Sequence, residues 1–242
     1  MKYIRSFLVY LWIIVILILF LPYRWWCNRL KEKDELKGYQ MLDKLVKPFC
    51  KGILILGGIK LTIKGRENIP QEGNVLFVGN HQSMLDIVTM LLAVNRPMGF
   101  VAKESLAKIW LIRTWIECIG SVFIARGESR KALQAIINSA KIVKSGHSLM
   151  IYPEGTRSKD GSLGEFKPGS LKIASRGEAA IVPVAVDGNY KVLPAGTIWV
   201  KSEKVTLTFL PPIPAAEVQA EDTTILAERI AKEIAQCLAK NN

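Results

Sequence analysis

The sequence has few of the residues that build metal sites and disulfide frameworks. Its 242 residues include two histidines, His81 and His147, and four cysteines. No two cysteines have the CxxC spacing of zinc and redox sites, and two of them lie in apolar stretches. This pattern argues against a zinc site and against a disulfide framework. We expect packed, reduced thiols, which suit a domain in the cytoplasm.

The chain also lacks internal repeats, low-complexity segments and a clear linker, and its length suffices for one sizeable core. The net charge is +12, which calls for an acidic partner. The basic residues are spread along the chain without a recognisable DNA- or RNA-binding motif. We therefore expect membrane lipids and a phosphorylated substrate as partners, and no nucleic acid.

Apolar residues gather near the N-terminus. Phe7–Leu21 is an unbroken apolar run preceded by Lys2 and Arg5. As a helix this run reaches about 22 Å, short of a hydrocarbon core of about 30 Å. The aromatic and basic cluster Pro22–Trp26 follows it, without a small-residue cleavage site. This arrangement predicts a retained anchor that spans the membrane with strain or lies embedded in it. The second apolar stretch, Phe49–Leu61, is too short and too interrupted for a span.

From about Ile59 the pattern alternates between strands and helices. The expected strands are Lys60–Lys64, Val75–Val78, Met98–Ala102, Ser121–Ile124, Ser148–Tyr152, Ala180–Val186, Ile198–Val200 and Val205–Phe209. The expected helices are Met84–Val94, Glu104–Glu117, Ser129–Lys144, Gly169–Ser175 and Thr224–Ala239. This order predicts an α/β fold with a single open, largely parallel mixed sheet and helices on both faces. We expect a membrane-anchoring helical segment over residues 1–58 and a catalytic domain over residues 59–242.

A histidine and a carboxylate, His81 and Asp86, stand at the junction between the strand Val75–Val78 and the helix Met84–Val94. On a regular helix five residues are about 140° of rotation, so the two side chains meet only if His81 lies in the loop and Asp86 in the first helical turn. Asp86 then either closes a capping box with Ser83 as N-cap, or holds the imidazole so that its other nitrogen acts as a base.

A second polar stretch, Tyr152–Ser158, also follows a strand, and ligands collect at such strand ends in α/β sheets. Arg157 offers a planar fork suited to phosphate, and Gly155 allows backbone N–H groups to approach an anion. An ordinary polar turn with a surface arginine is the alternative. Lys167, a little later, is either a second phosphate contact or a solvated lysine.

Two weaker features complete the pattern. Lys103 and Arg126 each follow an expected strand, so both can face the same cleft or be surface charges. Pro183 interrupts the apolar strand Ala180–Val186. Because proline cannot donate to the ladder, this strand is expected at the sheet edge or bulged there, unless Pro183 is simply core.

In order and approximate spacing, these blocks resemble the 1-acylglycerol-3-phosphate acyltransferase family of membrane glycerolipid acyltransferases. The resemblance extends from about Lys60 to Val186, and PEGTRS placed about seventy residues after HxxxxD is its most specific part. The matching residues are Asn80, His81 and Asp86 for HxxxxD; Lys103, Leu106, Gly120, Phe123 and Arg126 for the second block; Tyr152–Ser158 for PEGTRS; and Pro183 for the fourth block. The chain departs from the family where Trp110 and Arg113 stand near a usual proline and glycine.

The resemblance implies transfer of a fatty acyl group to the sn-2 hydroxyl of lysophosphatidic acid, giving phosphatidic acid, from an acyl-carrier-protein or coenzyme A thioester and without a metal or redox cofactor. His81 is then the general base and Asp86 orients it. The implied substrate-binding residues are Glu154, Gly155, Thr156, Arg157, Lys103, Arg126 and Lys167. The expected location is the cell (inner) membrane, with the catalytic domain facing the cytoplasm. The alternatives are another lysolipid acceptor, such as a lyso-ornithine lipid, or a non-enzymatic protein that binds anionic lipids.

Overall fold

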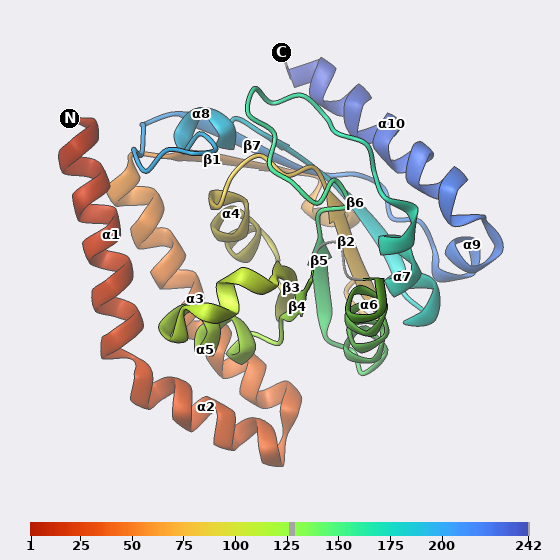
Figure 1. The fold of residues 1–242 in the computed structure, drawn as a ribbon, viewed down its shortest axis with the longest axis horizontal. Helices are drawn as coiled ribbons and strands as arrows, with labels where there is room; N and C mark the ends of the chain where they lie inside the picture. The colour runs from red at the N-terminus through yellow and green to blue at the C-terminus, as the bar shows by residue number, and fades with distance from the viewer. Residues whose placement is uncertain (126–128, 242) are drawn as a thin grey trace.

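The computed structural model describes residues 1–125 and 129–241 and contains one seven-stranded sheet (Figure 1). The strand order is β1-β7-β6-β2-β5-β3-β4. Neighbouring strands are parallel except for β6 and β7, which run antiparallel. The strands are β1 (Lys60–Lys64), β2 (Val75–Gly79), β3 (Met98–Lys103), β4 (Val122–Ile124), β5 (Ser148–Ile151), β6 (Ala180–Asp187) and β7 (Lys204–Phe209). The expected α/β fold is thereby confirmed.

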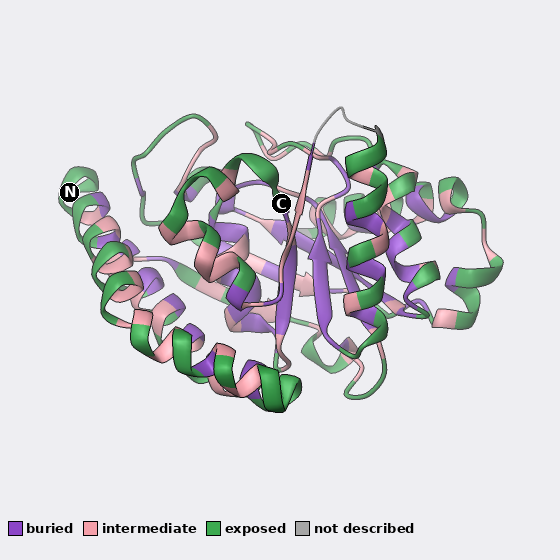
Figure 2. Ribbon diagram, turned by 60° about the horizontal axis from the view of Figure 1, so that its bottom comes forward, coloured by how far each residue is buried: buried purple, intermediate pink, exposed green. Residues whose placement is uncertain are grey.

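Helices cover both faces of this sheet, and the strands β2, β5 and β6 are almost entirely buried between them (Figures 1 and 2). Along β2, Val75 and Phe77 pack with one layer of helices, and Leu76 and Val78 pack with the other. Successive side chains of a strand point to opposite faces, so a continuous apolar run serves both cores. The longer helices are α1 (Lys2–Leu19), α2 (Leu21–Lys33), α3 (Glu35–Gly57), α4 (Leu85–Ala93), α5 (Trp110–Cys118), α6 (Ser129–Lys144) and α10 (Thr223–Asn241).

Short helices fill the connections. They are the 3₁₀ turns η1 (Arg66–Asn68), η2 (Glu104–Lys108) and η3 (Pro168–Leu171), and the helices α7 (Lys172–Arg176), α8 (Asn189–Val192) and α9 (Ala215–Ala220). The single helix expected over Glu104–Glu117 is therefore wrong, because η2 and α5 are separated at Ile109, whose backbone is extended. The expected helix Gly169–Ser175 is likewise divided between η3 and α7.

Ile198–Val200 is not the strand that its β-branched residues predict. The segment lies against α1, where the Ser6 hydroxyl accepts a hydrogen bond from Val200 N at 2.8 Å. The Tyr10 hydroxyl donates to Ile198 O, also at 2.8 Å. Side chains of α1 thus satisfy backbone groups that a neighbouring strand would otherwise pair.

Pro183 is buried in an interior strand, because β6 lies between β7 and β2. The expectation that Pro183 is simply core is therefore confirmed, and the alternative of a sheet edge is wrong. Pro183 is in register with Val78 of β2, and its carbonyl oxygen accepts from Leu210 N at 2.9 Å on the other side. Beyond this point the pairing slips by one residue, from Val184 opposite Phe209 to Ile181 opposite Ile213. The irregularity that proline requires therefore lies in the segment beside it, between Phe209 and Ile213, and not at a sheet edge.

The N-terminal helices pack on the α/β part rather than standing apart from it. Trp12 of α1 donates its indole N–H to Phe49 O of α3 at 3.1 Å. Val9 belongs to a buried cluster that also contains Leu85 of α4 and Val205 of β7. This cluster crosses the boundary expected at residue 58, which stays a prediction. In Figure 2 the outer sides of α1 and α2 are largely exposed.

Candidate active site

The carboxyl ends of β2, β5 and β3 open into a cavity of about 520 Å³. His81 follows β2, Tyr152 and Arg157 follow β5, and Lys103 ends β3; all four line this cavity. Apolar side chains, among them Met84, complete its wall. A larger cavity of about 730 Å³ lies beside α3, at the amino ends of the same strands. We assign the active site to the smaller cavity because His81 and three cationic side chains lie together there.

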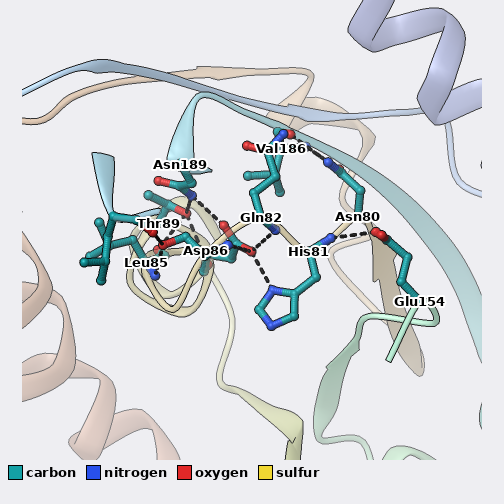
Figure 3. A network of polar contacts seen from close by, with 11 residues as sticks. Asn80, His81, Gln82, Leu85, Asp86, Thr89, Glu154, Val186 and Asn189 are labelled. Carbon is teal, nitrogen blue, oxygen red and sulfur yellow. Dashed lines mark hydrogen bonds and ion pairs between the residues drawn. The ribbon is translucent and has the colours of Figure 1, made fainter. Parts of the chain in front are cut away.

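His81 and Asp86 meet directly, in the way the loop-and-first-turn arrangement requires. His81 Nδ1 lies 2.6 Å from Asp86 Oδ2, and the Asp86 side chain is fully buried. A carboxylate only accepts hydrogen bonds, so Nδ1 carries the proton and Nε2 carries the lone pair in the neutral ring. Figure 3 shows Nδ1 turned toward Asp86 and the second ring nitrogen turned away from it.

The same carboxylate organises the start of α4. Asp86 Oδ2 accepts from Gln82 N at 2.7 Å and from Ser83 N at 2.9 Å. The helix begins at Leu85 with Met84 as N-cap, so the expected N-cap at Ser83 is one residue early. The two alternatives for Asp86 are therefore not exclusive, because one side chain satisfies the loop N–H groups and orients the imidazole.

Tyr152 fixes the plane of the imidazole. The two rings stack with centroids 4.2 Å apart and planes 13° apart. The Tyr152 hydroxyl oxygen is buried without a partner among the described residues, and burial raises the pKa of this phenol well above its ordinary value, with the Asp86 charge acting in the same direction. Tyr152 is therefore a neutral stacking surface rather than an acid or base.

Glu154 ties two loops together and is buried. Its Oε1 accepts from His81 N at 2.8 Å, and its Oε2 accepts from Gly164 N at 3.0 Å. Burial raises the pKa of Glu154, and these two hydrogen bonds oppose the shift. A further bond joins Ser158 N to His81 O at 2.8 Å. In the structure Glu154 therefore holds two backbone N–H groups of the site, and the substrate-binding role that the resemblance implies stays a prediction.

The remaining predicted residues lie around the mouth of the cavity. Gly155, Thr156, Arg157, Lys167 and Lys103 all line it. Gly155 has a φ of +68°, which closes the turn after Tyr152 and favours glycine. Three cationic groups from separate segments therefore flank the space in front of His81. Arg126 lies outside the described residues.

His147 lies away from this site, directly before β5 and so at the amino ends of the strands. It is buried, stacks on Tyr39 with centroids 4.0 Å apart, and donates from Nε2 to Ile119 O at 3.1 Å. Burial lowers the pKa of His147 to about 4, so the ring is neutral near pH 7. In the described part of the chain, no group of three or more His, Cys, Asp or Glu side chains has a metal-binding arrangement.

Two residues of the site had no signal in the sequence that identified their roles. Tyr152 belongs to the turn motif Tyr152–Ser158, which does not indicate stacking on His81. Asn189 lies more than a hundred residues beyond Asp86, in no motif, yet it donates to Asp86 Oδ1 at 2.8 Å. Asn189 reaches Asp86 only because the fold brings the end of β6 next to α4.

Residues 60–187 match the Acyltransferase family. A probable 1-acyl-sn-glycerol-3-phosphate acyltransferase of Mycoplasma pneumoniae is 30% identical over 77% of this chain and 74% of its own length. The crystal structure of the 1-acyl-sn-glycerophosphate acyltransferase PlsC from Thermotoga maritima is similar, with a TM-score of 0.85 and 26% identity. That likeness covers 99% of this chain and 95% of the other.

Other matches span a smaller part of the relative. The chloroplastic 1-acyl-sn-glycerol-3-phosphate acyltransferase LPAT1 of Arabidopsis thaliana is 36% identical over 57% of this chain. That match spans only 39% of the plant protein. Across three relatives, LPAT1 among them, the chain spans 39% to 53% of their length.

Proposed function

Because the chain belongs to the Acyltransferase family, we propose that it transfers a fatty acyl group from an acyl thioester to the sn-2 hydroxyl of 1-acylglycerol-3-phosphate, forming phosphatidic acid. The observation that carries this proposal is the His81–Asp86 pair at 2.6 Å, at the wall of a cavity flanked by three cations. The names of the relatives from Mycoplasma pneumoniae and Thermotoga maritima support the choice of acceptor.

His81 acts as the general base in this reaction. An alcohol is a poor nucleophile until its proton is removed, and the unprotonated Nε2 removes it as the hydroxyl oxygen attacks the thioester carbonyl carbon. Asp86 stabilises the resulting imidazolium. The carbon–sulfur bond then breaks, and the imidazolium of His81 gives this proton to the departing sulfur, so the donor leaves as a free thiol and His81 is neutral again. A thioester is already activated, so the step needs no serine or cysteine nucleophile, and no metal or redox cofactor.

The cations define where the acceptor's phosphate binds. Arg157 presents five N–H donors in a plane and can make two parallel bonds to a phosphate, whereas Lys103 and Lys167 act as point charges. All three line the cavity together with His81. The apolar part of the wall, which includes Ile87 and Phe100, suits an acyl chain.

We also propose that α1 attaches the protein to the cell membrane, with the site on the cytoplasmic side. The helix is long and apolar enough to cross a membrane, although by length alone its 18 residues reach only about 27 Å. Most of its large apolar side chains are exposed, as are Trp25 and Trp26 of α2. Because α1 also packs along α3, these contacts favour a helix embedded in one leaflet over a free-standing span.

Turnover of a radiolabelled acyl thioester with a panel of lysolipid acceptors tests the proposal. The panel holds lysophosphatidic acid, a lysophospholipid with a larger head group, a lyso-ornithine lipid and monoacylglycerol, each with coenzyme A and acyl-carrier-protein thioesters. We expect lysophosphatidic acid to be the best acceptor and phosphatidic acid the product. A preference for the lyso-ornithine lipid would move the chain to another acceptor, and the absence of transfer to every acceptor would refute the enzymatic function.

A further inference from the structure

Asn189 reaches Asp86 because of a tight turn at the end of β6. It is the first residue of α8 and is fully buried. The preceding Gly188 has a φ of +96°, and a Cβ there would lie 2.3 Å from the carbonyl oxygen of Lys204. Glycine is therefore required at the turn, which brings the Asn189 amide against α4.

The direction of the Asn189 amide is fixed by its partners. Its Nδ2 donates to Asp86 Oδ1 at 2.8 Å and to Thr89 Oγ1 at 3.2 Å (Figure 3). The Thr89 hydroxyl proton is used on the α4 backbone, toward Leu85 O or Asp86 O. Thr89 Oγ1 and Asp86 Oδ1 are both acceptors toward this amide, so the NH₂ group faces them.

The two oxygens of Asp86 are held unequally. Oδ2 receives three hydrogen bonds, from His81 Nδ1, Gln82 N and Ser83 N. Among the residues that the structure describes, Asn189 is the one donor to Oδ1. A fully buried carboxylate without a donor on one oxygen loses much of the stabilisation of its charged form.

We propose that Asn189 is a positioning residue of the acyl transfer, which keeps the Asp86 carboxylate turned so that Oδ2 faces the His81 Nδ1–H. The inference rests on the function proposed above. Removing the amide leaves Oδ1 without its donor and frees the carboxyl group to rotate, so Oδ2 no longer holds the imidazole in its orientation.

The experiment compares Asn189→Ala, Asn189→Asp and the control Asn74→Ala. Asn74 loses a comparable side-chain hydrogen bond, to Gly177 O at 3.1 Å, at the amino end of β2. For Asn189→Ala we expect kcat to fall about ten- to a hundredfold, the usual effect of losing a hydrogen bond to a charged group. The KM values of both substrates should stay within about twofold, because the amide touches neither. Asn74→Ala should change neither kcat nor KM.

Asn189→Asp keeps the volume of the side chain, so it tests the inference if the alanine variant fails to fold. It replaces the donor to Asp86 Oδ1 by a carboxyl group, so kcat should fall at least as far as in the alanine variant. The proton resonance of the His81 Nδ1–H group reports its hydrogen bond to Asp86 without turnover, and it should shift in both variants.

The outcomes separate this inference from the function on which it rests. If the wild-type protein transfers no acyl group, or if His81→Ala keeps its activity, the proposed function is wrong. If those two results are as expected but both Asn189 variants keep the wild-type kcat and the wild-type His81 Nδ1–H resonance, the positioning role alone is wrong. A lower melting temperature with kcat and this resonance unchanged would likewise make Asn189 a structural residue.

Discussion

At the scale of single residues, Arg157 separates phosphate binding from chemistry. Its guanidinium lines the cavity with His81 and has the geometry for two parallel bonds to a phosphate. Arg157→Lys should raise the KM for lysophosphatidic acid, and Arg157→Ala should raise it about ten- to a hundredfold. Steady-state kinetics with each substrate varied in turn measures this. A rise confined to the thioester's KM would assign Arg157 to the donor's phosphates instead.

Glu154 has a different expected signature. Its carboxylate accepts from His81 N and Gly164 N, so Glu154→Gln replaces one acceptor by an N–H donor that faces an N–H group. The loop that carries His81 is then misplaced, and kcat should fall about tenfold while the acceptor's KM changes little. A substrate-binding role, as the sequence suggested, would instead raise the acceptor's KM and spare kcat.

His147 should control acid stability without taking part in the reaction. Burial lowers its pKa from the ordinary 6.5 to about 4, so below pH 6.5 the unfolded chain binds a proton that the folded chain does not. Stability is therefore fully present above pH 6.5 and is lost as pH falls toward 4, by about 3 kcal/mol in total. Unfolding followed between pH 7 and pH 4 should show a weaker pH dependence in His147→Gln. An unchanged slope would contradict the buried neutral ring.

How much of the site the sequence reveals depends on how local each contact is. His81 and Asp86 are five residues apart at a strand-to-helix junction, so their pairing follows from the chain's own geometry. Glu154 and Asn189 contact this loop across 73 and 103 residues, and nothing in their neighbourhoods encodes the partner. Tyr152 belongs to a recognised motif, but its stacking on His81 needs the adjacency of β2 and β5.

At the scale of elements, strands were predicted better than connections. Continuous apolar runs identified β2, β5 and β6 because both faces of these strands are buried. The failures have tertiary causes. Ile198–Val200 has its backbone groups satisfied by α1, and Glu104–Glu117 breaks at Ile109 into η2 and α5. Pro183 is tolerated inside the sheet because the pairing of β6 with the segment Phe209–Ile213 shifts by one residue at this point.

The exposed face of α1 carries a prediction about membrane binding. Deleting residues 1–26 would also remove Val9 and Ser6 from buried positions, so it confuses attachment with stability. The triple variant Phe7→Glu, Leu11→Glu and Ile14→Glu changes exposed side chains only. Co-sedimentation with anionic vesicles should fall about a hundredfold or more, because three apolar side chains no longer enter the bilayer.

Comparable exchanges on other helices control for two of the three added charges. Leu133→Glu on α6 and Ile225→Glu on α10 also replace exposed apolar residues. At physiological salt they should leave vesicle binding within about twofold, since charges farther than a Debye length of about 8 Å from the bilayer are largely screened. Equal losses in both sets would mean that net charge, rather than the face of α1, sets membrane affinity.

At the scale of the whole molecule, β2, β5 and β3 are neighbouring parallel strands, so their carboxyl ends lie side by side. The candidate site lies at these strand ends. The helices α1 and α3 pack beside it and share a buried cluster with Leu85, the residue before Asp86. The fold therefore links the helices that we propose to face the membrane and the His81–Asp86 pair in one body. This suits the proposed function, whose acceptor is dissolved in the bilayer.

The most direct test is the turnover of His81→Ala with saturating acyl thioester and lysophosphatidic acid in vesicles. We expect kcat to fall about 10²- to 10⁴-fold, the usual contribution of a general base, with the KM of each substrate little changed. His147→Ala serves as the matched control and should lose stability but keep its kcat below its melting temperature. A loss of less than about tenfold in His81→Ala, or an equal loss in both variants, would contradict the assignment of His81 as the base.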